Sequence, residues 1–417
     1  YITIIRFRTI FESNVMANIT QLKHLEHIED EMLNYGVEGC DAAVSAMKEM
    51  LRMLGKKPSS GYMQTKWDGA PAVVCGKHPV NGMFFAGTKS VFNKEPKICY
   101  DEQDVDTMYG DASADLKEKL KFCVKYFPDL NIPTVVQGDL LFTSDVKEEE
   151  VEGEKLYVFT PNTITYGIPI DHPIGKKIKS AKIGIVFHTH YTGNELTTMT
   201  ARGGAPTAQF TQSDNVVVVE NDTEMSDVSV DTSKLKKFEA NVTVIGKMCQ
   251  KSGKFLDHLV ENMGTSGDKK FHVASYLKQF FNAEIKASRS ITDPKKALKQ
   301  LGTFYHEKMN KEVSKMKSVQ KQAERRKQLY DGLGYLEDNE QEFHAMFNLY
   351  RKIQENKTIV IEALDNLETF RTFVRTDKGY KVTAPEGYVL HHNGDMIKLV
   401  NRIEFSYINF TLAKQWR

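Results

Sequence analysis

The sequence predicts an α+β protein in which a strand-rich body is interrupted by a long helical segment. Between residues 61 and 232, short runs rich in Val, Ile, Phe and Thr alternate with Gly, Pro, Asn and Asp, which is typical of strands and turns. From residue 233 to 375, apolar residues recur at helical spacing among long polar runs. Strand patterns return in residues 376–417. We therefore expect the last strands to complete the body that the first part of the chain begins.

Residues 1–60 are predicted to form a separate N-terminal helical segment. The stretch GKKPSSG, residues 55–61, breaks the helical pattern and marks the end of this segment. Two groups of apolar side chains repeat at helical spacing before it: Leu22, Leu25, Ile28, Met32 and Leu33, and then Ala43, Met47, Met50, Leu51 and Leu54.

The strand-rich part, residues 61–232, contains one predicted helix at 114–130, which ends near a proline. The expected strands are short apolar runs bounded by turn residues. In chain order they are MQTKW, PAVVCG, MFFAGT, TVVQGDLLFT, KLYVFT, KIGIVFHTHY and NVVVVEN.

Composition and charge narrow the class of protein. The chain of 417 residues is 41% hydrophobic and 27% charged, as in ordinary soluble proteins, and it lacks the run of about 18 apolar residues that would span a membrane. Five scattered cysteines favour a reducing, cytoplasmic location over a disulfide framework. The net charge of +1 hides an asymmetry, because residues 233–330 contain 22 Lys/Arg against 9 Asp/Glu. A block this basic suggests a polyanionic partner.

Six short motifs follow one another at predicted strand ends. Alone, KWDG would be an ordinary surface turn, because Asp-Gly is a common turn pair. In chain order the motifs are KWDG (66–69), GTKSVFNK (87–94), VVQGDLLF (135–142), KIGIVFHTHY (182–191), PEGYVL (385–390) and DMIKLV (395–400). This ordered set resembles the covalent nucleotidyltransferase superfamily of ATP-dependent DNA and RNA ligases and mRNA capping enzymes. It is also similar to uncharacterised ligase-like proteins of large tailed phages.

The resemblance covers roughly residues 60–205 and 380–410, and it implies a fold. That fold is a nucleotidyltransferase (ligase adenylylation) domain of antiparallel sheets with flanking helices. Its first part would be residues 61–232 and its C-terminal strands residues 376–417. A basic helical insertion domain, residues 233–375, would interrupt it.

The resemblance also implies the chemistry. Lys66 would attack the α-phosphorus of ATP, expel pyrophosphate and hold AMP through a phosphoramide bond. Asp68 and Gly69 would shape the turn behind it, and Thr65 would contact the nucleotide. Since the attacking amine must be uncharged, we expect desolvation or nearby cations to lower the pKa of Lys66.

The remaining motif residues are expected around the nucleotide. Lys89 would lie near the ribose, Asp139 would accept a ribose hydroxyl or bind metal-associated water, and Phe187 would stack on the base. Glu386 would bind the catalytic Mg²⁺ or Mn²⁺, with Asp139 as a second metal ligand, and Lys398 would stabilise the α-phosphate. Three of these residues also have an ordinary alternative: Lys89 as a solvated lysine, Asp139 as a turn-capping aspartate and Phe187 as a core phenylalanine.

The chain departs from the family pattern at several places. Val400 stands where a second lysine is common, with Arg402 as the nearest cation, and Asp139 replaces the usual glutamate. His391 stands where RNA ligases often have lysine. We expect no OB-fold after the last motif, which favours an RNA-ligase-like enzyme over a DNA ligase or a capping enzyme. The same departures leave open a non-catalytic phage protein, nucleic-acid-binding or virion-associated, that retains the fold.

A second candidate site lies in the strand KIGIVFHTHY. His188 and His190 alternate there, so we expect them to share a face of a sheet, where they could chelate a metal. His391 and His392 form another pair, but no further ligand has the spacing of a zinc site. A dedicated zinc site is therefore not expected.

The basic block 233–330 is expected to bind nucleic acid, either RNA or a nicked duplex. Backbone phosphates attract cations, and unpaired bases stack on exposed rings. The alternative is that the aromatic residues of the block form a core and that its lysines are only solvated. These aromatic residues are Phe255, Phe271, Tyr276, Phe280, Phe281, Phe304 and Tyr305.

The motifs and the basic block together predict an ATP- and Mg²⁺-dependent polynucleotide ligase. AMP would pass from Lys66 to a 5′-phosphate, and a 3′-hydroxyl would then displace it and seal the strand. The expected location is the cytoplasm, or the host cytoplasm for a viral protein. The resemblance to phage proteins also allows association with the virion.

Overall fold

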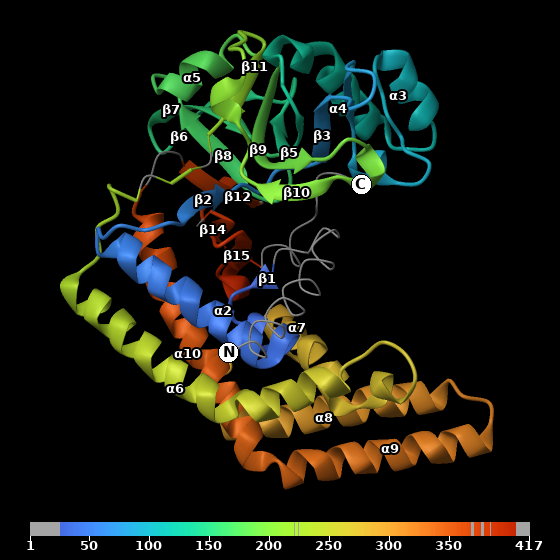
Figure 1. The fold of residues 1–417 in the computed structure, drawn as a ribbon. Helices are drawn as coiled ribbons and strands as arrows, with labels where there is room; N and C mark the ends of the chain where they lie inside the picture. The colour runs from blue at the N-terminus through green and yellow to red at the C-terminus, as the bar shows by residue number, and fades with distance from the viewer. Residues whose placement is uncertain are drawn as a thin grey trace, which may run out of the picture.

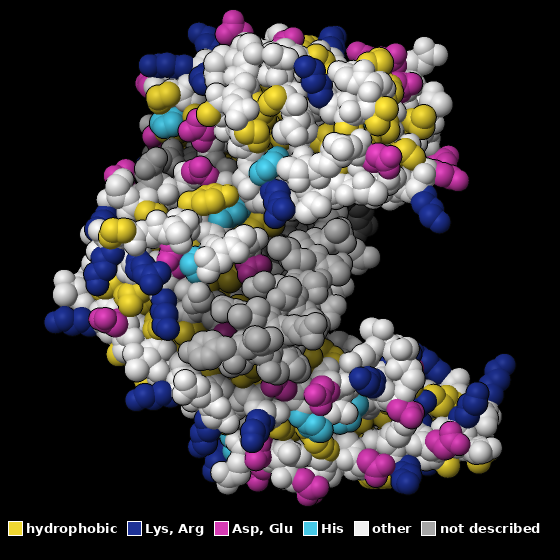
Figure 2. All heavy atoms as spheres, in the orientation of Figure 1, with side chains coloured by type: hydrophobic (Ala, Val, Ile, Leu, Met, Phe, Trp, Pro, Cys, Tyr) yellow, Lys and Arg dark blue, Asp and Glu magenta, His cyan; other side chains and the backbone are white. Residues whose placement is uncertain are grey.

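The computed structural model describes residues 26–220, 222–223, 225–367, 371–376, 379–383 and 385–405. The part of the predicted N-terminal segment that holds Leu22 and Leu25 lies outside these residues. Figure 1 shows a strand-rich lobe at one end, a body of long helices at the other, and a small sheet between them. In the same view, Figure 2 shows acidic and basic side chains interspersed over both parts. Antiparallel sheets combined with helices confirm the α+β class.

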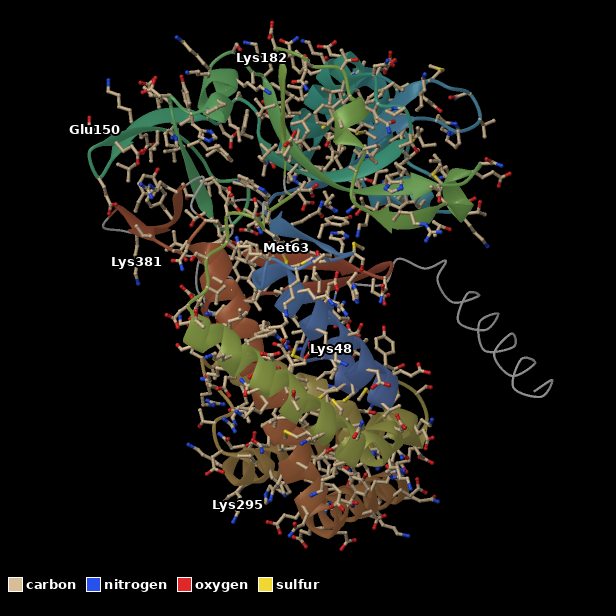
Figure 3. All side chains as sticks on the ribbon, turned by 60° about the vertical axis from the view of Figure 1, so that its left-hand side comes forward. Lys48, Met63, Glu150, Lys182, Lys295 and Lys381 are labelled. Atoms are coloured by element: carbon tan, nitrogen blue, oxygen red, sulfur yellow. The ribbon has the colours of Figure 1, made fainter. Side chains whose placement is uncertain are left out.

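The small sheet, sheet A, is built from segments far apart in the sequence. Its order is β1-β15-β14-β2, antiparallel except for the parallel pair of β1 and β15. Met63 is fully buried in the core that this sheet shares with the helices, and Figure 3 shows it at the junction of the two parts. Alternation along β2 then turns Gln64 and Lys66 to the opposite face, toward the strand-rich lobe. The strands are β1 (Glu26–His27), β2 (Tyr62–Lys66), β14 (Gly387–His392) and β15 (Asp395–Leu399).

Sheet B forms the centre of the strand-rich lobe. Its order is β10-β9-β5-β3-β4, and β11 pairs in parallel with β9. Apolar side chains of α3 (Glu102–Met108) and α4 (Ala114–Tyr126) share a core with this sheet. The helix predicted at 114–130 therefore forms as α4 followed by a 3-10 turn. The strands are β3 (Ala72–Lys77), β4 (Phe84–Gly87), β5 (Val135–Phe142), β9 (Ile183–Thr192), β10 (Thr200–Gly203) and β11 (Val216–Val219).

Sheet C flanks sheet B and receives the chain again after the helical body. Its order is β13-β12-β8-β7-β6. β12 pairs antiparallel with β8, so residues 371–376 already belong to the strand-rich lobe rather than to the insertion predicted to extend to 375. The elements are β6 (Lys147–Val151), β7 (Glu154–Phe159), β8 (Thr165–Pro169), α5 (Pro173–Ile178), β12 (Arg371–Thr376) and β13 (Gly379–Val382).

The helical body unites the predicted N-terminal segment with the insertion in one core. α2 (Glu31–Leu54) packs along α6 (Thr232–Asn262), and the backbone N–H of Val37 donates to Oδ1 of Asp257 at 2.8 Å. Gly36 has a φ of +59° there, and a Cβ at this position would lie 2.1 Å from the same oxygen, so glycine permits the contact. The other helices are α7 (Leu277–Lys286), α8 (Pro294–Ser314), α9 (Val319–Asp338) and α10 (Glu340–Asp365). Short 3-10 helices are η1 (Lys89–Phe92), η2 (Phe127–Leu130), η3 (Leu196–Thr198), η4 (Thr207–Gln209), η5 (Asp268–Phe271) and η6 (Val273–Tyr276).

A buried cluster of charges joins the last strand to the helical body. Nζ of Lys357 in α10 lies 2.6 Å from Oε1 of Glu29, and both side chains are almost fully buried. Nη1 of Arg402 lies 2.9 Å from each carboxylate oxygen of Asp30, and its Nη2 donates to Asn282 of α7. Because a buried charge is costly without a partner, these pairs constrain how the segment after β15 meets the helices.

Among the residues that the structure describes, no helix combines the length and the apolar composition needed to cross a bilayer. All five cysteines are buried free thiols.

Candidate functional site

The candidate site lies on the face of sheet A that turns toward sheet B. Lys66 is the last residue of β2 and stands opposite Gly387 of β14 in the antiparallel register. Glu386 directly precedes Gly387, and its Oε2 lies 2.5 Å from Nζ of Lys66. The fold therefore brings together the motifs KWDG and PEGYVL, although Lys66 and Glu386 are 320 positions apart in the sequence.

The charge balance around Lys66 differs from the expected one. Burial disfavours the ammonium, but the carboxylates of Glu386, Asp139 and Asp68 outweigh it and raise the pKa of Lys66. Burial also raises the pKa of Glu386, against the attraction of Lys66. The expectation of a lowered lysine pKa is wrong for this arrangement, because the surrounding carboxylates raise it.

Asp68 anchors the turn that follows Lys66. Its side chain is 5% exposed and accepts hydrogen bonds from Nδ2 of Asn162 at 2.7 Å and from the backbone N–H groups of Thr163 at 2.8 Å and Ile164 at 2.9 Å. Its own N–H donates to the hydroxyl of Tyr166 at 2.7 Å. These contacts hold the turn against the loop before β8, so Asp68 acts as a support for Lys66.

Gly69 permits the close approach of this turn to β5. A Cβ at position 69 would lie 2.6 Å from Cβ of Asp139 and 2.9 Å from the carbonyl oxygen of Leu140. The next residue, Ala70, donates its N–H to that same carbonyl at 2.9 Å. The absence of a side chain at Gly69 therefore lets Asp139 lie beside the turn that carries Lys66.

A β-bulge in β9 decides which side chains face Asp139. Thr189 stands opposite Gln137, but the next pair joins Phe187 to Gly138, so His188 is an extra residue. Strict alternation, which sequence reasoning assumes, fails at this point.

The bulge turns Phe187 into the core and His188 toward the site. Phe187 is 1% exposed and makes edge-to-face contacts with Phe127, at 6.1 Å between ring centroids, and with Phe210, at 5.5 Å. The expected role of Phe187 in stacking on a base is therefore corrected, because its ring has no exposed face. Nε2 of His188 instead lies 3.5 Å from Oδ2 of Asp139.

The same bulge separates the two histidines of β9. His190 stands opposite Val136, which belongs to the core beneath sheet B, and its Nδ1 lies 2.7 Å from the carbonyl oxygen of Gly204. The expectation that His188 and His190 share a face is wrong. Within the described part of the chain, no group of three or more His, Cys, Asp or Glu side chains is arranged to hold a metal ion.

Two carboxylates remain as candidate ligands for the expected divalent metal. Oε2 of Glu386 lies 2.5 Å from Nζ of Lys66, and Asp139 lies beside the turn that follows Lys66. Mg²⁺ in phosphoryl-transfer sites commonly takes one or two carboxylates and completes its shell with substrate phosphates and water. This donor set fits such an ion in the presence of a nucleotide, and it does not fit a zinc site made of protein ligands alone.

Lys398 of β15 supplies a second amine on the same face of sheet A. It stands opposite Val389 of β14 and pairs with His27 of β1. Burial and then the charge of Lys66 lower the pKa of Lys398, while Glu386 acts in the opposite direction. The site therefore holds two lysines with oppositely shifted pKa values.

Val400, which stands where the ligase-like motif commonly has a second lysine, packs among apolar side chains. Val400 is 2% exposed, and its Cγ2 would lie 2.8 Å from a Cβ added at Gly387. Arg402, the nearest cation in the sequence, is held by Asp30 in the helical body and does not replace that lysine.

Two further predicted nucleotide contacts, Thr65 and Lys89, lie in different surroundings. Thr65 projects from the opposite face of β2, and its hydroxyl lies 3.3 Å from that of Thr223. Lys89 is exposed at the start of η1, just beyond β4. The pairing of β4 with β3 places it at the end of sheet B where Asp139 lies.

Sequence reasoning did not single out a polar chain beside Lys66. Nε2 of His391 donates to Oε1 of Gln64 at 2.7 Å, and Nε2 of Gln64 donates to Asp222 at 2.7 Å. The His391 ring stacks on Tyr62 at 4.3 Å, and burial lowers the pKa of His391 to about 4, so the ring is neutral. The spacing of Tyr62, Gln64 and Lys66 at every second residue is the sequence pattern that could have revealed this row.

Comparison with known proteins places the chain in a family. A family model described as a family of unknown function, DUF6267, matches residues 18–414. The chain belongs to DUF6267. No curated protein and no solved structure matches it. The ligase-like resemblance of this DUF6267 chain therefore stays a prediction from the order of its sequence motifs.

The insertion of the DUF6267 chain uses many of its aromatic residues as core. Tyr276, Phe280, Phe281 and Tyr305 are at most 6% exposed, so the interpretation of these rings as stacking surfaces for bases is wrong. Phe255, Phe271 and Phe304 are partly buried against the same core. Any contact of this block with nucleic acid must therefore come chiefly from its cations.

Proposed function

We propose that this protein is an ATP-dependent polynucleotide ligase, RNA-ligase-like, that works through a covalent lysine–AMP intermediate at Lys66. The observation that carries the proposal is the meeting of Lys66, Glu386, Asp139 and Lys398, from distant segments, between sheets A and B. A nucleophilic amine, a pair of carboxylates and a second cation are the groups that transfer of AMP to a lysine requires.

In the proposed first step, Nζ of Lys66 loses a proton and attacks the α-phosphorus of ATP. The N–P bond forms as the bond to pyrophosphate breaks. The proton passes to solvent water, and the charge of Lys398 offsets the charge that develops on the α-phosphate. Mg²⁺ or Mn²⁺ held by Glu386 and Asp139 would neutralise part of the phosphate charge.

In the following steps AMP moves from Lys66 to a 5′-phosphate at a nucleic-acid end. A 3′-hydroxyl then attacks that activated phosphate and releases AMP. Asp68 and Gly69 act through Lys66, because they hold its turn against the strand-rich lobe.

The second candidate is a non-catalytic phage protein, nucleic-acid-binding or virion-associated, that retains this arrangement. Three observations favour it: the raised pKa of Lys66, the burial of Phe187, and Val400 at the position of the second lysine.

One labelling experiment separates the two candidates. Purified protein is incubated with α-labelled ATP or GTP and with Mg²⁺ or Mn²⁺, denatured, and assayed for covalently retained label. We expect label from ATP on the wild type, none on Lys66→Arg, which keeps a cation beside Glu386, and undiminished label on Lys77→Ala, which removes an exposed lysine of β3.

Absence of label with both nucleotides, on protein shown by mass spectrometry to carry no AMP, would contradict the ligase proposal. Label that persists on Lys66→Arg would assign the nucleophile to another residue.

A further inference from the structure

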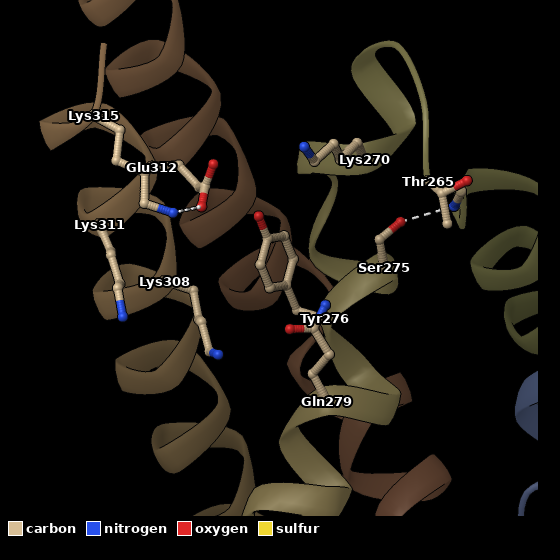
Figure 4. A pocket seen from close by; sticks show the side chains of 10 residues that line it. Thr265, Lys270, Ser275, Tyr276, Gln279, Lys308, Lys311, Glu312 and Lys315 are labelled. Carbon is tan, nitrogen blue, oxygen red and sulfur yellow. Dashed lines mark hydrogen bonds and ion pairs between the residues drawn. The ribbon is translucent and has the colours of Figure 1, made fainter. Parts of the chain in front are cut away.

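A polar pocket lies in the helical body, at the end of the molecule away from sheet B. It has a volume of about 340 Å³ and lies between α8 and the connection from α6 to α7. Figure 4 shows Lys308, Lys311 and Lys315 on one wall, with Tyr276 and Lys270 on the other. None of these residues belongs to the site around Lys66.

The side chains that line this pocket include more lysines than acidic residues. Lys308 and Lys311 are three residues apart and share one face of α8, and Lys315 directly follows the end of the helix. Glu312 is the acidic residue among the lining side chains, and it pairs with Lys315 at 3.0 Å. Lys308 and Lys311 have no carboxylate partner among the residues that the structure describes, and neither has Lys270.

Two of these amines lie over aromatic rings. The ammonium of Lys308 lies 5.2 Å from the centre of the Phe304 ring, and that of Lys270 lies 5.4 Å from the centre of the Phe271 ring. Such cation–π contacts favour one position of a long side chain over free solvation. Because like charges held together repel, the arrangement favours binding of an anion between them.

A neutral donor completes the lining. Tyr276 is 6% exposed, and its hydroxyl donates to the sulfur of Met309 at 3.5 Å. A thioether is a weak acceptor, so this hydroxyl can turn to a stronger one such as a phosphate oxygen. Burial raises the pKa of Tyr276, so the phenol keeps its proton.

We propose that this pocket binds a phosphate group of a nucleic-acid strand. The ligand chemistry is a phosphate ester, and the basic character of the whole block 233–330 favours a strand over a free nucleotide, because neighbouring phosphates would meet further lysines. The inference concerns a site separate from Lys66 and does not depend on the ligase reaction.

The test compares two double variants of α8 in the full chain. Lys308→Ala with Lys311→Ala removes two pocket lysines, whereas Lys295→Ala with Lys299→Ala removes two exposed lysines of the same helix outside the pocket. Binding of a fluorescent 20-nucleotide single strand is measured by anisotropy between 50 and 200 mM salt. We expect the magnitude of the slope of log affinity against log salt to fall by about 0.7 in the pocket variant, the amount for one lost phosphate contact, and to change less in the control.

Equal changes in both variants, or no change in either, would overturn the pocket assignment. Calorimetry with AMP and with inorganic phosphate distinguishes the two sources of phosphate. If the pocket variant loses binding of AMP while its strand binding stays at the wild-type level, the strand assignment is overturned. Adduct formation at Lys66 is measured on the same variants and should stay at the wild-type level, so failure here is distinguishable from failure of the proposed ligase activity.

Discussion

Replacement of Asp68 by alanine should destabilise the strand-rich lobe strongly. The buried carboxylate accepts three hydrogen bonds, at 2.7, 2.8 and 2.9 Å, from the loop of residues 162–164. A hydrogen bond to a charged group contributes about 1.5–3 kcal/mol, and water entering the vacated space would recover part of the sum. We therefore expect Asp68→Ala to lower the free energy of unfolding by about 3–5 kcal/mol. Asp68→Asn can still accept from the two backbone N–H groups and should cost about 1 kcal/mol.

Trp67 offers a local reporter for this measurement. It neighbours Asp68, is 3% exposed, and packs on Tyr166 at 4.6 Å between ring centroids. The chain has two tryptophans, so a Trp416→Phe background leaves Trp67 as the single source of emission. Urea unfolding followed at this residue then reports the transition of the strand-rich lobe.

The control is Asp115→Ala in α4, where the carboxylate is 54% exposed and pairs with Lys119 on the surface. Its effect should stay within about 0.5 kcal/mol. A loss of less than about 0.5 kcal/mol for Asp68→Ala as well would refute the anchoring role derived from its contacts.

Three further predictions concern single interactions. The carboxylate of Glu386 helps to raise the pKa of Lys66, so Glu386→Gln should lower the pH at which acetic anhydride acylates Lys66. Mass spectrometry of the Lys66 peptide after labelling at a series of pH values gives the midpoint of this reaction. A midpoint that is unchanged or higher in the variant contradicts the prediction. Because Phe187 lies in the core, Phe187→Ala should lower the free energy of unfolding of the strand-rich lobe by about 3–5 kcal/mol, and Phe187→Leu by less than about 1.5 kcal/mol. A nearly neutral alanine variant would show that the ring is not packed. Lys357→Met leaves Glu29 buried without its closest partner and should lower the free energy of unfolding by about 3–5 kcal/mol, measured by thermal or urea unfolding. The double variant Glu29→Gln with Lys357→Met should recover most of that loss. Equal losses in the single and double variants would contradict the ion-pair account.

The sequence predictions that agree with the structure rest on local patterns of turn residues and of apolar periodicity. The turn residues around KWDG, PEGYVL and DMIKLV mark strands locally, and their order led us to place Lys66, Glu386 and Lys398 at one point, where the fold brings them together. The helix at 114–130 and the long helices of the insertion also follow from local periodicity.

The errors arise where a property depends on a partner far away in the chain. The bulge that buries Phe187 exists only in the register between β9 and β5 and leaves no mark in the alternation of either strand. The pKa of Lys66 is set by carboxylates that tertiary structure supplies. Arg402 looked like a substitute phosphate ligand because its partner Asp30 lies 372 residues earlier in the sequence.

The assembly of sheet A has a consequence for when the site can exist during synthesis. β2 emerges early from a ribosome, but its neighbour β14 follows only after the entire helical body has been made. Until then Lys66 has neither Glu386 beside it nor Lys398 on the adjoining strand, and its carboxylate surroundings come from the strand-rich lobe alone. A nascent or truncated chain that stops before β14 therefore lacks the site, and the ion pair at Lys66 marks a chain in which β14 has been made and has paired with β2.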